Sequence, residues 1–256
     1  MEFLTDIVPV PALLGCLFIG FVAGVVKGMV GFAMPMIMIS GMGSLVSPEL
    51  ALAGLILPTL ATNGWQALRQ GVAPAWASVK RFRMFLMIGF LTLIISAQMV
   101  RILPVDAMLL MIGVPIVLFA VTQLMGVQLT LGEHPPRWIE VLTAAFAGAI
   151  GGISGVWGPP TVAYLTALKT PKKEHVRVQG VIYGLGAAAL LVAHIASGVV
   201  RWHTLPFAVA LLVPALSGMW LGFQVQDRID QQAFRKATLV VLLLAGGNLV
   251  RRGLLS

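Results

Sequence analysis

Apolar residues occupy most of this chain in ten blocks, which are separated by short polar breaks. Each half holds five blocks: residues 8–27, 32–46, 50–68, 84–100 and 105–126, then 139–154, 159–168, 178–200, 205–226 and 233–250. Most are close to the roughly 20 residues with which a helix crosses ~30 Å of hydrocarbon. Pro, Gly and charged residues mark the breaks, and we expect loops at 71–83, 169–177 and 227–230. The pattern predicts an all-α integral membrane protein.

The composition agrees with a bilayer as the solvent. The 256 residues are 59% hydrophobic and 10% charged, so the chain has too little polar surface to cover a water-soluble globule. A net charge of +8 would be compatible with nucleic-acid binding. The Lys and Arg residues, however, lie in short loops and form no basic face with interleaved aromatic residues. Lipid is therefore an expected partner and nucleic acid is not. The single cysteine, Cys16, excludes an internal disulfide and a cysteine-based metal cluster.

A spacing of glycines occurs twice. Gly24, Gly28 and Gly31 surround Lys27 in GVVKGMVGFAMP, and Gly151, Gly155 and Gly158 recur at one constant offset in GGISGVWGPP. The same offset relates Gly71-Val72 to Gly198-Val199 and Arg101-Ile102 to Arg228-Ile229. Such self-matching indicates a duplicated unit. We expect one membrane domain, with residues 1–130 as the first repeat, 131–137 as a connecting loop and 138–256 as the second repeat.

The loop charges predict that the repeats are inverted. Lys and Arg in short loops accumulate on the cytoplasmic side of a membrane. An odd number of crossings per half places most of them on one side and leaves Arg101, Arg201, Arg251 and Arg252 on the other, whereas an even number divides them equally. An odd number also places both termini outside the cytoplasm and inverts the second repeat relative to the first.

The first two segments of each repeat are unusual. Residues 159–168 would form a helix of about 15 Å, roughly half a bilayer, and the connection before them is too apolar for a solvated loop. We expect each pair to form a broken or re-entrant helical hairpin whose tip lies near mid-membrane; two fully spanning helices are the alternative. Gly-broken apolar segments at corresponding places in two halves are typical of a transporter binding site.

Lys27 is the strongest candidate for a ligand-binding residue. A lysine deep in a bilayer is usually paired or faces a polar site, although it could also extend to the interface or make a purely structural contact. All nine acidic residues fall at or beyond the ends of the apolar segments, so the spans offer Lys27 no carboxylate. We therefore expect it to meet the negative charge of a ligand.

Other polar side chains inside the apolar segments complete the predicted site. His194 is either a core residue or a ligand to the anion, and Trp157 either packs or donates its N–H. Asn63 and Gln66 lie on one helix face with Thr59 and Gln70, either as contacts between helices or as cavity lining. The glycines either pack helices closely or expose backbone N–H groups to an anion. The predicted substrate-binding residues are Lys27, Gly28, Gly31, Asn63, Gln66, Ser154, Gly155, Trp157, Gly158, Gln179, Tyr183 and His194.

The two glycine motifs, the inverted duplication and the length resemble the sulfite exporter TauE/SafE family. The resemblance covers almost the whole chain and implies transport of small sulfur-containing anions, such as sulfite and sulfoacetate, across the bacterial inner membrane. It implies that the six glycines above and Pro159-Pro160 are family motif positions. Lys27 is not carried over from the family.

These observations predict a membrane transporter of small anions, with sulfite or organosulfonates as the expected substrates and export as the expected direction. The alternatives are a membrane-embedded enzyme and a structural or assembly protein that transports nothing. Enzyme motifs such as a Walker A loop, G-x-S-x-G or H-E-x-x-H are missing from the sequence. We expect no catalytic residue, no metal and no cofactor, and the sequence leaves a homo-oligomer open.

Overall fold

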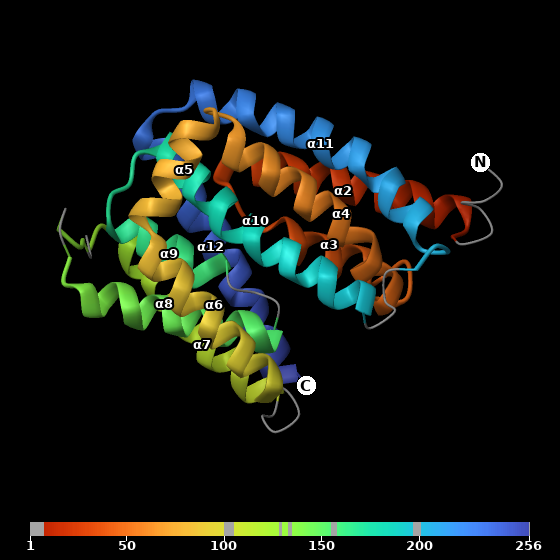
Figure 1. The fold of residues 1–256 in the computed structure, drawn as a ribbon. Helices are drawn as coiled ribbons and strands as arrows, with labels where there is room; N and C mark the ends of the chain where they lie inside the picture. The colour runs from red at the N-terminus through yellow and green to blue at the C-terminus, as the bar shows by residue number, and fades with distance from the viewer. Residues whose placement is uncertain are drawn as a thin grey trace. The chain divides into compact units, whose positions relative to one another are not determined.

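The regular structure of the chain is helical throughout its described part (Figure 1). The computed structural model describes residues 8–99, 105–127, 130–132, 135–154, 158–196 and 201–255. Within these ranges there are eleven α-helices and no strand, which confirms the all-α prediction. The helices are α2 (Val10–Val30), α3 (Met34–Met42), α4 (Pro48–Leu68), α5 (Val72–Arg81), α6 (Arg83–Met99), α7 (Val105–Leu124), α8 (Arg137–Ser154), α9 (Gly158–Ala167), α10 (Lys172–Ala196), α11 (Leu205–Arg228) and α12 (Gln231–Leu255).

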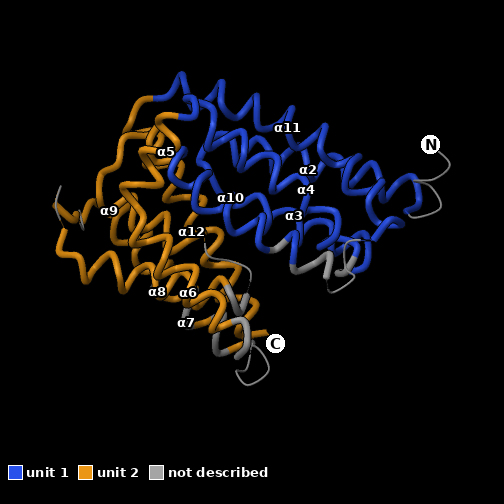
Figure 2. Tube along the Cα trace, viewed as in Figure 1, with its two compact units in different colours: residues 1–72, 176–229 blue, residues 73–175, 230–256 orange. Residues whose placement is uncertain are grey.

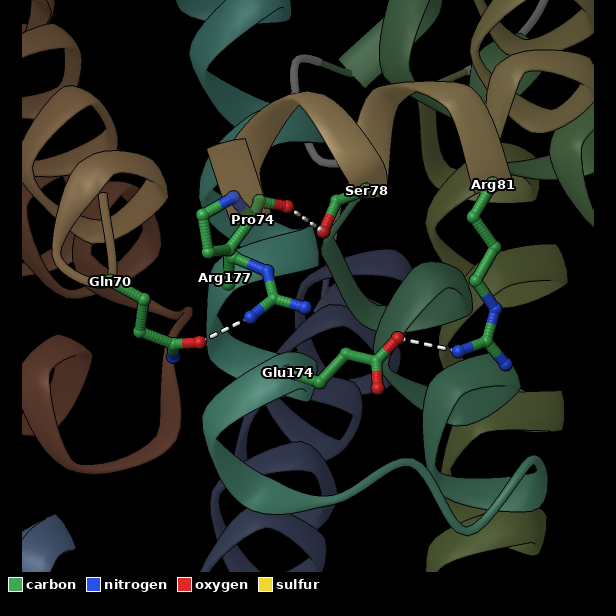
Figure 3. A network of polar contacts seen from close by, with 6 residues as sticks. All are labelled: Gln70, Pro74, Ser78, Arg81, Glu174 and Arg177. Carbon is green, nitrogen blue, oxygen red and sulfur yellow. Dashed lines mark hydrogen bonds and ion pairs between the residues drawn. The ribbon is translucent and has the colours of Figure 1, made fainter. Parts of the chain in front are cut away.

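Each predicted apolar segment corresponds to one helix, but two predicted loops are wrong. Residues 71–83 contain α5, and α10 begins at Lys172, inside the expected loop 169–177. Contacts at these positions account for the difference (Figure 3): Arg81 of α5 forms an ion pair with Glu174 of α10 at 2.5 Å, and Ser78 Oγ donates to the Pro74 carbonyl. The last turn of α5 and the first turns of α10 are polar, so a search for apolar runs misses α5 and begins α10 too late.

Several helices are suited to a bilayer by length and by their outer faces. Among the described residues, α2, α11 and α12 are long and apolar enough to cross a membrane, and α6 carries a shorter apolar stretch, Arg83–Ser96. Large apolar side chains are exposed along these helices, including Leu14 and Phe18 of α2 and Val213 of α11. Exposed apolar faces of this extent fit lipid as the surrounding solvent.

The chain divides into two compact units, each described here by itself (Figure 2). Unit 1 comprises Met1–Val72 and Val176–Ile229, and unit 2 comprises Ala73–His175 and Asp230–Ser256. Both units therefore combine segments from the first and the second half of the sequence.

In unit 1, α11 packs along α2 and also contacts α4, while α3 contacts both α2 and α4. Missing side chains allow the close approach of α2 to α11: a Cβ at Gly24 would lie 2.3 Å from the Ala215 carbonyl oxygen, and one at Gly222 would lie 2.2 Å from that of Val25. Met34, Met38 and Phe207 belong to the apolar core of this unit.

In unit 2, α6 packs along α8, α7 packs along α12, and α9 contacts α7, α8 and α12. A glycine again permits the closest approach, since a Cβ at Gly148 of α8 would lie 2.1 Å from the Gly89 carbonyl oxygen of α6. In both units, then, the helix that precedes a short helix packs closely against a helix from the other half of the sequence.

Candidate functional site

The most unusual polar group in unit 1 is the ammonium group of Lys27. This side chain lies in the last turn of α2 and is 1% exposed. Its Nζ donates a hydrogen bond to Oδ1 of Asn63 on α4. In unit 1, the only carboxylate whose side chain the structure describes is Asp227, and it is paired with Arg69 at 2.5 Å. Lys27 therefore meets a neutral partner and does not extend to the protein surface.

Two amides on α4 have their orientations determined by their partners. An ammonium group only donates, so the Asn63 atom that accepts from Lys27 is Oδ1, and Nδ2 points elsewhere. Gln66 Nε2 donates to the carbonyl oxygens of Gly31 at 3.0 Å and Val176 at 2.7 Å, which fixes that amide as well. Asn63 Nδ2 and Gln66 Oε1 are buried and have no hydrogen-bond partner among the described residues.

Gly31 shapes the site from the end of α2. It caps the helix in a left-handed conformation, with φ 90°, and its N–H donates to the Lys27 carbonyl at 2.7 Å. A Cβ at this position would lie 1.7 Å from Gln179 Oε1 and 3.2 Å from Gln66 Nε2. The positive φ and the close side chains both require glycine here.

The surrounding side chains extend the polar region along α4 and α10. Gln179 is fully buried, and Tyr183, one turn further along α10, is 6% exposed. Thr59 and Thr62 are buried on α4, where the Thr62 hydroxyl donates to the Pro58 carbonyl at 2.6 Å. Three members of the predicted polar face, Thr59, Asn63 and Gln66, are therefore buried, and hydrogen bonds connect the last two to residues of α2 and α10. Gln70 follows the end of α4 and is half-buried.

The structure thus brings together five of the predicted site residues in unit 1: Lys27, Gly31, Asn63, Gln66 and Gln179, with Tyr183 adjacent to Gln179 on the same helix face. Gly28 is placed differently. A Cβ there would lie 2.2 Å from the Met219 carbonyl oxygen, so this glycine provides close contact between α2 and α11.

The remaining predictions concern the second half. Gly155 and Trp157 lie outside the described residues. Ser154 ends α8 and His194 lies in α10, but the side chains of both are outside the described part, while Gly158 begins α9. Sequence reasoning missed the Val176 carbonyl as a partner of Gln66, because a main-chain acceptor carries no sequence signal.

A separate cavity of about 440 Å³ lies in unit 2. Apolar and aromatic side chains line most of it, among them Phe119, Phe146 and Tyr164. It contains none of the predicted site residues, and it lacks a charged lining residue.

The fold and this site define a class of protein: an all-helical membrane protein that buries a lysine among neutral amides. The model of the family described as Sulfite exporter TauE/SafE matches residues 16–249. The chain belongs to this family, which is a family of membrane transporters. Comparisons with curated proteins and with solved structures found no match.

Proposed function

We propose that this protein transports a small sulfur-containing anion, of the sulfite or organosulfonate class, and that Lys27, Asn63 and Gln66 bind it. The buried Lys27 ammonium, whose described partner is a neutral amide, is the observation that carries the proposal. An ionised group buried without an opposite charge is unstable unless a ligand or a polar environment compensates it. An anion compensates it, and family membership supports sulfite-related transport.

The two unpartnered amide atoms refine the chemistry of the proposed substrate. Asn63 Nδ2 is a donor and suits an oxyanion oxygen, while Gln66 Oε1 is an acceptor. A ligand that satisfies both presents several acceptor oxygens and one O–H or N–H donor. Hydrogen sulfite and sulfonates that carry a donor group meet this requirement, with Gln179 and Tyr183 as further contacts.

We infer that the second half contributes the other side of the site. Ser154, Gly155, Trp157 and Gly158 would form the second hairpin tip, and His194 would contribute from α10. Gly28 supports the first tip through its contact with α11 and, in the proposal, also borders the anion through its backbone.

The packing pattern supports the inverted-repeat arrangement that this proposal needs. Helix α2, the first of one proposed hairpin, packs on α11, and α8, the first of the other, packs on α6. These are corresponding segments of repeats 1–130 and 138–256, exchanged between the halves. Helices α3 and α9 have 9 and 10 residues, which suits re-entrant helices that cross half a bilayer.

Export is the direction that the membrane potential favours. Moving one negative charge outward, down the electrical gradient of an inside-negative membrane, releases ~2.3 kcal/mol per 100 mV. A monovalent anion therefore leaves the cell without a coupled ion. We place the protein in the bacterial inner membrane, with both termini in the periplasm.

The test is anion flux in proteoliposomes loaded with sulfite or with sulfoacetate, at an imposed inside-negative potential. We expect efflux that rises with the potential and is reduced to the level of empty liposomes by Lys27→Met. Efflux equal to that of empty liposomes for both anions contradicts the proposal.

A further inference from the structure

A second group of buried polar side chains lies in unit 2, whereas Lys27, Asn63 and Gln66 belong to unit 1. We call it the Arg235 cluster and define it as Thr166, Thr170, Arg235 and Thr238. Thr166 is on α9, Thr170 follows α9, and Arg235 and Thr238 are one turn apart on α12. Helices α7, α9 and α12 each contact the other two, and Arg235 of α12 is hydrogen-bonded to Gln123 of α7.

Hydrogen bonds and a ring contact hold the first turns of α12 against residues 170–175. Gln231 Nε2 donates to the Thr170 carbonyl at 3.3 Å, and the Lys172 N–H donates to Gln231 Oε1 at 2.9 Å. The ring of His175 packs edge-on against Phe234, with centroids 5.4 Å apart. Gln231, Phe234, Arg235 and Thr238 share one face of the helix, because they follow the i, i+3, i+4, i+7 spacing. Thr238 therefore continues the face that contacts Thr170.

Four polar side-chain groups of the cluster have no hydrogen-bond partner among the described residues. The hydroxyl groups of Thr166, Thr170 and Thr238 are buried without a partner in the described part of the chain, as is Nε of Arg235. The three threonines are 7%, 4% and 1% exposed. A buried polar group left without a partner costs about 1–3 kcal/mol, so four such groups together are unfavourable unless a ligand accepts from them.

The charge of the cluster indicates what that ligand is. Arg235 donates to Oε1 of Gln123 on α7, which is a neutral group, and no ion pair involves Arg235 among the described residues. A guanidinium group cannot lose its proton in proteins and only donates hydrogen bonds. The cluster thus offers one positive charge and four unused donors, and it lacks the carboxylates that a metal cation requires.

We propose that the Arg235 cluster is a second anion site, which binds a small oxyanion such as sulfate or sulfite through Arg235 Nε and the threonine hydroxyls. An oxyanion has enough acceptor oxygens for all four donors, and guanidinium and hydroxyl groups are common ligands of such anions. Binding would also join α9 to α12. The proposal rests on unit 2 alone and does not depend on transport through the Lys27 site.

The test is thermal unfolding of purified protein titrated with millimolar sodium sulfate, compared with sodium chloride at equal ionic strength. Sulfate at high concentration stabilises proteins generally, without saturation, so the site is measured as the saturable rise at low concentration. We expect that rise in the wild type and in Lys27→Met, which separates the cluster from the proposed transport site. Repeating the titration with sulfite tests the second anion.

Three variants establish where the anion binds. Arg235→Lys keeps the charge but loses Nε, and we expect at least a tenfold weaker saturable response. Arg252→Gln removes a charge from an exposed position on the same helix and should leave the response unchanged. Thr238→Val removes an unpartnered hydroxyl, so without anion it should melt at the same or a higher temperature, and its sulfate response should weaken.

Three results overturn the proposal. One is a wild-type protein without a saturable response to either anion, and another is a response that Arg235→Lys leaves intact. The third is a Thr238→Val protein that melts lower without anion and responds normally to it, since the hydroxyl would then serve only the fold.

Discussion

Lys27 on α2 and Asn63 on α4 are joined by a hydrogen bond, although their side chains are 1% and 0% exposed. The bond connects a charged group to a neutral amide. A purely structural contact would be more stable with an apolar pair, because replacing buried ionic groups by well-packed apolar ones is often stabilising. The pair therefore suits a site that keeps a positive charge for a ligand.

Lys27→Met separates binding from folding, because methionine keeps much of the side-chain length and removes the charge. We expect the free energy of anion binding to weaken by about 2–5 kcal/mol, the usual effect of removing one partner of a buried charge pair. The same variant should unfold at an equal or higher temperature without anion. Sulfite titration followed by thermal unfolding checks both, with Arg235→Lys present in the wild-type and Lys27→Met proteins alike so that the Arg235 cluster does not contribute. A less stable variant with normal binding would contradict the assignment.

Asn63→Asp tests the role of charge at nearly constant shape. The new carboxylate would accept from Lys27 and neutralise it inside the protein. We expect flux of sulfite to fall to the level of empty liposomes while the protein remains folded in detergent. Flux similar to that of the wild type would mean that Lys27 does not bind the anion with its charge.

Gly31→Ala should destabilise the end of α2. Its φ of 90° lies in the left-handed region, which costs a non-glycine residue about 1–3 kcal/mol, and the new Cβ would clash with Gln179 Oε1. The matched control is Gly64→Ala on α4, where a Cβ meets nothing within 4 Å. Gly64→Ala should gain about 0.5–1 kcal/mol from higher helix propensity. Thermal unfolding of the two variants should thus shift in opposite directions.

His175 makes stability depend on pH. It lies in the charged first turns of α10, before the apolar part of that helix, and burial lowers its pKa from 6.5 to about 3. Below pH 6.5 the unfolded chain binds a proton that the folded protein does not, so stability falls as pH decreases from 6.5 toward 3, by up to about 1.4 kcal/mol per pH unit. His175→Gln, which does not titrate, should lose less stability between pH 7 and pH 5.5. Equal losses would contradict a buried neutral imidazole.

The proposed topology predicts the location of the C-terminus. Alkaline phosphatase folds only in the periplasm, so its fusion after Ser256 should be active and a fusion of a cytoplasm-only reporter should be inactive. The opposite pattern would place the C-terminus in the cytoplasm. It would contradict the proposed arrangement, in which an odd number of crossings per half gives an even total and puts both termini in the periplasm.

The sequence predicted the helices well where apolar runs are long, and poorly where polar residues form helix ends. α5 and the first turns of α10 were expected to be loops, because their stability comes from contacts such as Arg81 with Glu174 and not from apolar periodicity. The polar members of the Lys27 site could be selected from the sequence, since a polar residue inside an apolar run is conspicuous. Their pairing could not be predicted.

By itself the sequence determined the class of this protein: apolar segments of membrane length, a repeated glycine spacing, and a lysine without a carboxylate in the spans. These features follow from local composition, because the length and hydrophobicity of a segment determine whether it inserts into a bilayer. Only the tertiary structure decided that Lys27 meets Asn63 and that Gln66 reaches Gly31 and Val176. It also decided which polar atoms of unit 2, Arg235 Nε among them, are buried without a partner in the described part of the chain. Such pairings depend on how helices are rotated and shifted against each other, and that register is set by close packing, as where Gly24 and Gly28 contact the backbone of α11.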